Sequence, residues 1–222
     1  HGGLGSIDMF RTLLPALTAK RQVIAVDLQG HGRTPLGDRP IDLAAMGADM
    51  ATILQQLGVK QTDVLGYSLG GGVAFQLAVQ HPEMVRRLAL VSAGYAQDGL
   101  YPEMLPQQAA VGAGMAEMMK GTPMYTSYVA VAPKPEDFPR LLDAMGALMR
   151  KPYDFSADVP KLTMPVMLVF LLYSGWHVWA VPGAAVAVLA CFPWRGGRQR
   201  LGGPAVLLSG AADQCSRPLG AW

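Results

Sequence analysis

Cysteine is scarce in this sequence, and the patterns that mark metal and nucleotide sites are missing from it. The 222 residues include two cysteines, Cys191 and Cys215, and neither lies at a spacing typical of metal ligands. No loop of the form G-x-G-x-x-G or G-x-x-x-x-G-K-[ST] occurs, which argues against a dinucleotide or phosphate site. We therefore expect no metal ion and no cofactor, and we do not expect the two cysteines to form a structural disulfide.

An excess of charge of either sign is also missing. The sequence has 18 Lys and Arg against 16 Asp and Glu, a formal net charge of +2, which gives no reason to expect a nucleic acid or an acidic partner. Apolar residues make up 51% of the chain, enough for one sizeable core. We expect one globular unit.

Acidic residues and lysine almost disappear from the last quarter of the chain. Residues 1–161 contain fifteen acidic and fourteen basic residues, with no Trp and no Cys. Residues 162–222 contain one acidic residue, Asp213, four Arg and no Lys, together with all four Trp and both Cys. The two parts differ enough in composition to be interpreted separately.

One long apolar run lies within that second part. Residues 164–192 are long enough to span a bilayer, and their only readily ionisable side chain is His177. Pro182 and Gly183 interrupt the run, and nothing else in the chain is typical of a membrane protein, so we do not expect a membrane span. Because the chain begins with His1 inside a motif, we expect that its N-terminus is cut, and we expect a cytoplasmic protein.

Short apolar runs alternate with amphipathic stretches through the first ninety residues. A parallel pair of strands needs a crossover long enough to hold a helix, so this alternation predicts an α/β fold with a mostly parallel sheet and flanking helices. The predicted strands are residues 22–27, 62–66 and 87–92, and the predicted helices are residues 41–57 and 70–80.

Residues 95–158 change to short helical pieces rich in Met, Ala and Pro, and residues 166–170 then predict another strand. Apolar residues in these pieces recur at helical spacing: Met115, Met118 and Met119, then Leu141, Leu142, Met145 and Met149. The ordinary interpretation is core packing between short helices, since Met is usually filler. The functional alternative is a lid whose thioethers line an apolar substrate pocket.

A serine between glycines follows the second predicted strand. Residues 66–70 read GYSLG, which fits G-x-S-x-G, a motif in which a tight strand-to-helix turn exposes the serine. Small residues on either side of Ser68 let the strand and the helix approach closely. The alternative is a glycine-rich turn in which Ser68 only caps the helix. A nucleophilic serine also needs a neighbouring base and N–H donors for the developing oxyanion.

Several motifs together resemble the α/β-hydrolase fold superfamily. Residues 1–5 (HGGLG) resemble its oxyanion loop, residues 26–34 (VDLQGHGRT) the turn after the next strand, and residues 66–71 (GYSLGG) its nucleophile elbow. Residues 81–88 resemble the helix-to-strand link that follows the elbow. The resemblance covers about residues 1–170 and implies an α/β-hydrolase fold with a helical lid, incomplete at the C-terminus.

The resemblance implies a role for particular residues of these motifs. Ser68 is the expected nucleophile, and the backbone N–H groups of Gly3 and Leu69 are the expected oxyanion donors. His1, His31 and Asp27 are expected to be structural residues. Tyr67 and Leu69 are expected to flank the pocket.

The same resemblance implies an acid and then a histidine after the serine, and the sequence does not supply them in the expected places. The turn after residues 166–170 reads LLYSGWH in place of an acidic turn, and no histidine follows His177. Asp213 would be the acid if residues 171–203 are an insertion, which still leaves no base downstream. Alternatively, Asp98 is a relocated acid and His177 the base.

The change in composition and the missing catalytic partners fall at the same point, near residue 170. A reading-frame error in GC-rich coding DNA would leave such a break, so we hypothesise that residues from about 171 onward are not the evolved C-terminus. The expected divisions are a first part of the core at 1–94, a helical lid at 95–158, a core strand at 159–170 and an atypical, possibly frame-shifted segment at 171–222.

The resemblance finally implies a serine hydrolase that is esterase-like or lactonase-like and needs no cofactor. Its expected substrate is a small, largely apolar molecule with an ester or related acyl bond, and its activity is expected to be impaired because no base is found. The alternatives are an inactive ligand-binding homologue that keeps the pocket, a frame-shifted fragment, and a membrane-anchored form that uses residues 164–192.

Overall fold

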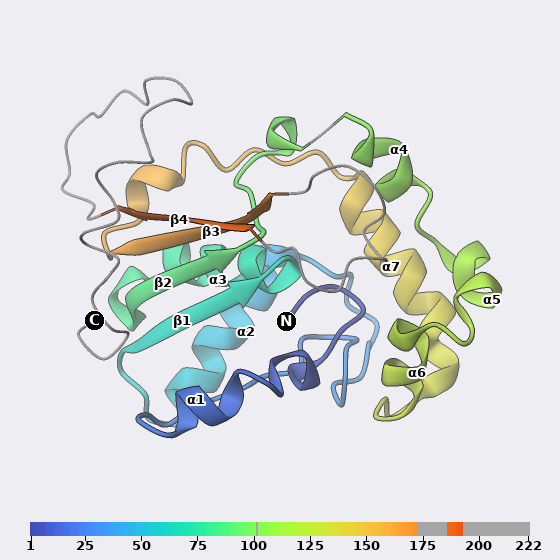
Figure 1. Cartoon of the computed structure of the whole chain (residues 1–222), viewed down its shortest axis with the longest axis horizontal. Coiled ribbons are helices and arrows are strands. Elements are labelled where there is room, and N and C mark those ends of the chain that lie inside the picture. Colours follow the sequence, from blue (N-terminus) through green and yellow to red (C-terminus); the bar gives the residue numbers. More distant parts are fainter. Residues whose placement is uncertain (101, 173–185, 193–222) are drawn as a thin grey trace.

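A four-stranded sheet forms the centre of the molecule. The computed structural model describes residues 1–100, 102–172 and 186–192. In these residues the strands follow the order β1-β2-β3-β4, with β1 to β3 parallel and β4 antiparallel to β3 (Figure 1). Their bounds are Thr62–Tyr67 (β1), Val85–Val91 (β2), Val166–Leu172 (β3) and Val186–Phe192 (β4).

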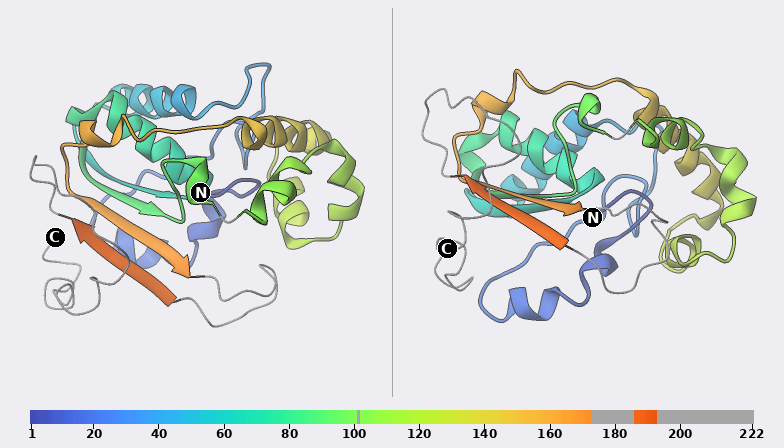
Figure 2. Two further views of the ribbon diagram at one scale, coloured as in Figure 1. Left: turned by 90° about the horizontal axis from the view of Figure 1, so that it is seen from above. Right: turned by 45° about the horizontal axis from the view of Figure 1, so that its top comes forward.

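Two helices cover one face of this sheet. The helix α3 lies against β1 and β2, and α2 packs beside α3 on the same side, as Figure 2 shows. The helix α2 (Leu43–Gln56) begins where the Asp42 carboxylate accepts the Ala45 N–H at 3.0 Å, and it ends before Gly58, whose φ of +69° favours glycine. The helix α3 (Leu69–Gln80) follows β1 with one residue between them.

The described residues contain five further helices and six 3-10 turns. The helices α4 to α7 gather on the side to which the carboxyl ends of β1 to β3 point (Figures 1 and 2). The bounds are α1 Leu14–Thr18, α4 Met104–Ala109, α5 Ala116–Met119, α6 Pro123–Val129 and α7 Phe138–Arg150, with 3-10 turns η1 Ile7–Phe10, η2 Pro82–Met84, η3 Gln97–Gly99, η4 Ala113–Met115, η5 Pro135–Asp137 and η6 Val159–Lys161.

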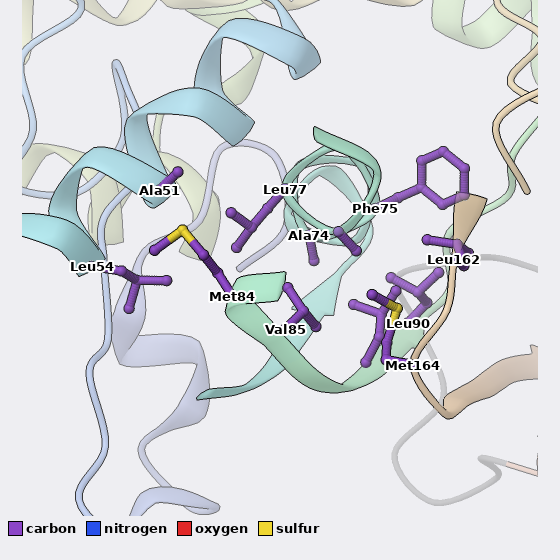
Figure 3. Close-up of a cluster of buried hydrophobic side chains, with 12 residues drawn as sticks. Ala51, Leu54, Ala74, Phe75, Leu77, Met84, Val85, Leu90, Leu162 and Met164 are labelled. Carbon is purple, nitrogen blue, oxygen red and sulfur yellow. The ribbon is translucent and has the colours of Figure 1, made fainter. Parts of the chain in front are cut away.

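The main core lies between the sheet and the two covering helices. Alternate residues of β2, among them Leu88 and Leu90, face α3, which contributes Ala74 and Leu77. Figure 3 shows this cluster, in which Met84 reaches toward α2. Fully burying a Leu-sized side chain stabilises the fold by about 1.5–3 kcal/mol, so this cluster fixes the sheet that carries the site.

A second core surrounds α7. Leu141, Leu142 and Met145 are fully buried there against Met46 of α2 and other apolar residues. Core packing is therefore confirmed for these three side chains. Met118, which had the same interpretation, is 71% exposed, because α5 is a single turn with one face on the cluster and the other in solvent.

Most of the predicted elements of the first ninety residues are confirmed. The helices at residues 41–57 and 70–80 are α2 and α3, and the strands at residues 62–66 and 87–92 are β1 and β2. The strand predicted at residues 22–27 is wrong, because these residues form no helix or strand. A strand requires a hydrogen-bonded partner, and within the described residues β1 pairs only with β2.

Candidate active site

Ser68 lies at a sharp turn between β1 and α3. Its backbone has φ +51° and ψ −115°, a conformation that non-glycine residues rarely adopt, and the side chain is exposed. Its N–H donates to the Val91 carbonyl at 2.8 Å, which ties the turn to the end of β2. The strained turn presents the Ser68 hydroxyl at the carboxyl edge of the sheet.

Glycines make this turn sterically possible. A Cβ added to Gly66 would collide with the Gly70 carbonyl, and one added to Gly71 would collide with the Ala93 side chain. A Cβ on Gly70 would lie 2.7 Å from the His1 carbonyl oxygen. Each of these glycines therefore lies where a neighbouring segment leaves no room for a Cβ: the start of α3 at Gly66, the segment after β2 at Gly71 and the N-terminal residue at Gly70.

The alternative in which Ser68 only caps the helix is wrong. Ser68 occupies the N-cap position of α3, yet its hydroxyl makes no capping hydrogen bond. The second and third amides of α3 are satisfied by backbone instead, since Gly70 N–H donates to the His1 carbonyl at 2.9 Å and Gly71 N–H to the Ser68 carbonyl at 2.8 Å. The Ser68 hydroxyl is therefore not engaged in capping α3.

The N-terminal loop, residues 1–5, lies directly against the turn at Ser68. A Cβ on Gly2 would be 2.9 Å from a ring carbon of Tyr67 and 3.5 Å from the Ser68 Cβ. Neither the Gly3 N–H nor the Leu69 N–H donates a hydrogen bond to any residue that the structure describes. Among the described residues, both amides therefore lack an acceptor.

Asp27 has the structural place expected for it. Its buried carboxylate accepts hydrogen bonds from the Ile7 N–H at 2.7 Å, the Arg33 N–H at 3.0 Å and the Arg33 guanidinium at 3.2 Å. Gly32, with φ +53°, lies where any Cβ would meet this carboxylate. Asp27 thus joins the turn at residues 26–34 to the start of η1.

The histidines of the described residues are not placed to act as a base toward Ser68. His1 is buried with both ring nitrogens in hydrogen bonds, to Gly2 O at 2.8 Å and to Leu28 N at 3.0 Å. His31 is fully buried, and burial lowers its pKa to about 4. His81 caps the far end of α3, about 18 Å along the helix from Ser68, and lies 3.6 Å from Glu83.

The remaining candidate partners make no hydrogen bond with Ser68 among the described residues or lie outside those residues. Asp98 lies in η3, beside a cavity that is also lined by Leu105, Ala109 and Met149. Asp213, His177 and Cys215 lie outside the described residues, and for Cys191 the structure describes only the backbone, in β4. The predicted acid and base, and the expected absence of a structural disulfide, therefore stay predictions.

Two placements close to the turn were not revealed by the sequence. Met145 of α7 packs on the N-terminal loop, with its Cε 2.9 Å from the position of a Cβ on Gly3. Ser92 follows β2 as Ser68 follows β1, with the same φ of +51°, and its buried hydroxyl has no hydrogen-bond partner among the described residues. Both placements depend on contacts between distant segments, which spacing along the chain does not encode.

The described residues contain no group of three or more His, Cys, Asp and Glu side chains that could hold a metal ion. Among the same residues, no helix combines the length and the apolar character needed to cross a bilayer.

Comparison with known proteins decides the family. A model of the alpha/beta hydrolase fold matches residues 1–222, a range that extends beyond the motifs of the first 170 residues. The chain belongs to the α/β-hydrolase fold family.

Among its relatives is the pimeloyl-[acyl-carrier protein] methyl ester esterase of Neisseria meningitidis serogroup B, which is 42% identical over 111 residues. The match covers 49% of this chain and 41% of the esterase, so the chain spans about two-fifths of the length of this relative.

Solved structures agree with the family fold. NosK from Streptomyces actuosus has a TM-score of 0.57 at 26% identity, over 77% of this chain and 73% of that protein. A thermophilic esterase from Thermogutta terrifontis has a TM-score of 0.57 at 20% identity, over 76% of this chain and 71% of that protein, and this likeness concerns the fold alone.

Proposed function

We propose that this chain is an α/β-hydrolase that cleaves an ester or related acyl bond of a small apolar substrate through Ser68. The observation that carries the proposal is the strained, exposed Ser68, which makes no capping bond and lies near the amides of Gly3 and Leu69, for which the described residues offer no acceptor. The esterase relative supports an ester as the substrate bond.

In the proposed reaction, the Ser68 oxygen attacks the carbonyl carbon of the substrate. The electron pair of the C=O bond moves to the carbonyl oxygen, and the Gly3 and Leu69 N–H groups stabilise that oxyanion. Donors already oriented toward the developing charge contribute about 2.7–4 kcal/mol each to the barrier. The leaving alkoxide departs with a proton, and water then releases the acyl group from Ser68 in a second step.

An apolar wall beside the serine fits an apolar acyl group. Leu69 follows Ser68 directly, and Leu69, Leu4 and Met149 all pack against the cluster around α7 that includes Met145. The lid interpretation of residues 95–158 is part of this proposal, since α7 and its neighbours supply the wall. Thioether side chains adapt to chains of different shape, which suits a flexible substrate.

We propose that this chain hydrolyses its substrate slowly. The serine must lose its proton on attack, and the three histidines of the described residues are held elsewhere or buried. Loss of the base costs serine hydrolases about 10⁴–10⁶-fold in kcat, whereas the oxyanion donors and binding alone retain about 10³-fold over water. We therefore expect weak activity that still depends on Ser68.

Hydrolysis of p-nitrophenyl butyrate tests this function. Release of p-nitrophenolate above the buffer rate should be slow in the parent chain and absent in Ser68→Ala. Ser127→Ala is the matched control, since Ser127 is exposed on α6 and remote from the elbow motif in sequence. A fast, Ser68-dependent rate would show that a working base exists, and a rate unchanged by Ser68→Ala would contradict the proposal.

A second candidate is a binding module that keeps the pocket without catalysis. The observation that favours it is the same engagement of His1, His31 and His81. Saturable binding of a short-chain ester that is unaffected by Ser68→Ala, together with no reaction of Ser68 with a fluorophosphonate, would favour this function over hydrolysis.

A further inference from the structure

The ring of His1 is fixed in one tautomer by its two hydrogen bonds. Nε2 lies 3.0 Å from the Leu28 backbone nitrogen, which can only donate, so Nε2 must carry the lone pair. In a neutral imidazole the proton then lies on Nδ1, which is 2.8 Å from the Gly2 carbonyl oxygen and donates to it. His1 is thus a bridge from the turn at Leu28 to the carbonyl of Gly2.

That carbonyl belongs to the same peptide bond as the Gly3 N–H. The peptide unit is planar and trans, so its C=O and N–H point in opposite directions. The Gly2 carbonyl also accepts the Gly5 N–H at 3.1 Å. Two donors therefore fix the direction of the carbonyl, and in doing so they fix the direction of the Gly3 N–H.

The glycines of this loop make such a restraint necessary. Gly2 and Gly3 have no Cβ, and the peptide between them would otherwise rotate more freely than between other residues. Contacts restrict the space around this peptide, since Tyr67 lies against Gly2 and Met145 against Gly3, but neither contact is directional. The hydrogen bond from His1 supplies the direction.

The turn at residues 26–34 holds His1 in place. The His31 ring packs against the His1 ring with centroids 5.3 Å apart, and its own Nδ1 donates to the Gln29 carbonyl at 2.8 Å. Gly30, with φ +76°, allows the tight path of this turn. The HGGLG and VDLQGHGRT motifs are therefore coupled in space through two histidine rings.

We propose that His1 is a positioning residue for the oxyanion hole. Its neutral ring, protonated at Nδ1, aims the Gly3 N–H by holding the other side of the same peptide, and the turn at Leu28 fixes the ring. The catalytic meaning of this role rests on the proposed function of Ser68 and Gly3. The orientation of the peptide itself does not, and it is measurable without any reaction.

Two conservative variants separate the two bonds of His1. In His1→Asn, the side-chain NH₂ occupies the place of Nδ1 and still donates to the Gly2 carbonyl, but it no longer reaches Leu28. In His1→Gln, the side-chain oxygen reaches the place of Nε2 and accepts from Leu28, while the Gly2 carbonyl loses its donor. His1→Ala removes both bonds, and unfolding midpoints of all three variants report any general loss of stability.

The first measurement is the NMR spectrum of protein labelled with ¹⁵N. His1→Asn removes the ring signals of His1 and so identifies them. In the parent chain we expect these signals to have the chemical shifts of the Nδ1–H tautomer. We expect the Gly3 amide signal to stay near its parent position in His1→Asn and to move in His1→Gln as far as in His1→Ala. An Nε2–H tautomer, or an equal displacement of Gly3 in His1→Asn and His1→Gln, would overturn the inference.

The second measurement is the rate of Ser68 modification by a fluorophosphonate. The maximal rate should fall by about 10–100-fold in His1→Gln and His1→Ala, with a smaller change in His1→Asn and little change in the half-saturating concentration. Equal rates in His1→Gln and the parent would overturn the positioning role. If the parent is not modified at all, the proposed function fails, and the NMR result alone decides whether His1 orients the peptide.

Discussion

At the scale of single residues, several residues in and around the site have a backbone conformation or a buried side chain that lowers the stability of the folded protein. Ser68 has a positive φ, Leu4 and Ser92 share that feature, and His31 is a titratable ring with no exposure. Such residues persist only when the surrounding structure compensates for them. Their energetic cost is therefore measurable by substitution.

Replacement of the serine by glycine should stabilise the protein. Gly adopts φ +51° without strain, whereas Ala retains the unfavourable Cβ of serine, so the free energy of unfolding of Ser68→Gly should exceed that of Ser68→Ala by about 1 kcal/mol. Denaturant unfolding measures both. In the matched pair at Ser127, which is helical, Gly should be less stable than Ala by about the same amount, and the same order at both sites would contradict the assigned strain.

The burial of His31 should make stability depend on pH. The unfolded chain takes up its proton near pH 6.5, but the folded protein does so only near pH 4, because burial disfavours the charged ring. Between these values the unfolded state binds more protons. The free energy of unfolding should therefore be full above pH 6.5 and fall by about 3 kcal/mol as the pH is lowered to 4, with no further loss from this group below that.

His31→Asn provides the control for this dependence. Asn keeps a donor toward the Gln29 carbonyl, the partner of His31 Nδ1, but does not titrate. Unfolding by urea at several pH values should give a flatter curve between pH 6.5 and 4 for the variant than for the parent. Equal slopes would contradict the prediction, because they would show that burial does not lower the pKa of His31 in the folded protein.

At the scale of elements, the strand-turn-helix unit around Ser68 was predictable because its signals are local. The apolar run of β1, the glycines and the periodicity of α3 all lie within about twenty residues. The strand at residues 22–27 was not correctly predicted, since pairing depends on what lies beside it. The contact of Met145 with Gly3 and the bridge through His1 also join distant segments, and no spacing rule reveals them.

The close packing of this strand-turn-helix unit predicts that one added methyl group will strongly lower the stability of the protein. Gly70→Ala places a Cβ 2.7 Å from the His1 carbonyl oxygen, and backbone cannot yield as a side chain end does, so the N-terminal loop must move. We expect a loss of about 2 kcal/mol or more in the free energy of unfolding, together with slower fluorophosphonate modification of Ser68. Gly99→Ala, where a Cβ meets nothing within 4 Å, should change neither quantity.

At the scale of the whole molecule, the described residues contain the proposed nucleophile Ser68 and the proposed oxyanion donors, but none of their histidines lies where it could act as a base toward Ser68. The composition changes near residue 170, where the expected acid and histidine are missing. The frame-shift hypothesis predicts that resequencing the codons for Val169 to Ser174 will reveal a single-base slip. The corrected frame should encode an acidic turn and a later histidine, and an intact frame without such a slip would refute the hypothesis.

The central claim, that Ser68 is a nucleophile, is tested most directly by prolonged reaction with a fluorophosphonate followed by mass spectrometry of the peptides. We predict one adduct, on Ser68, that also forms in Ser127→Ala and is absent from Ser68→Ala. An adduct that persists in Ser68→Ala, or a parent chain that remains unmodified at Ser68, would contradict the claim.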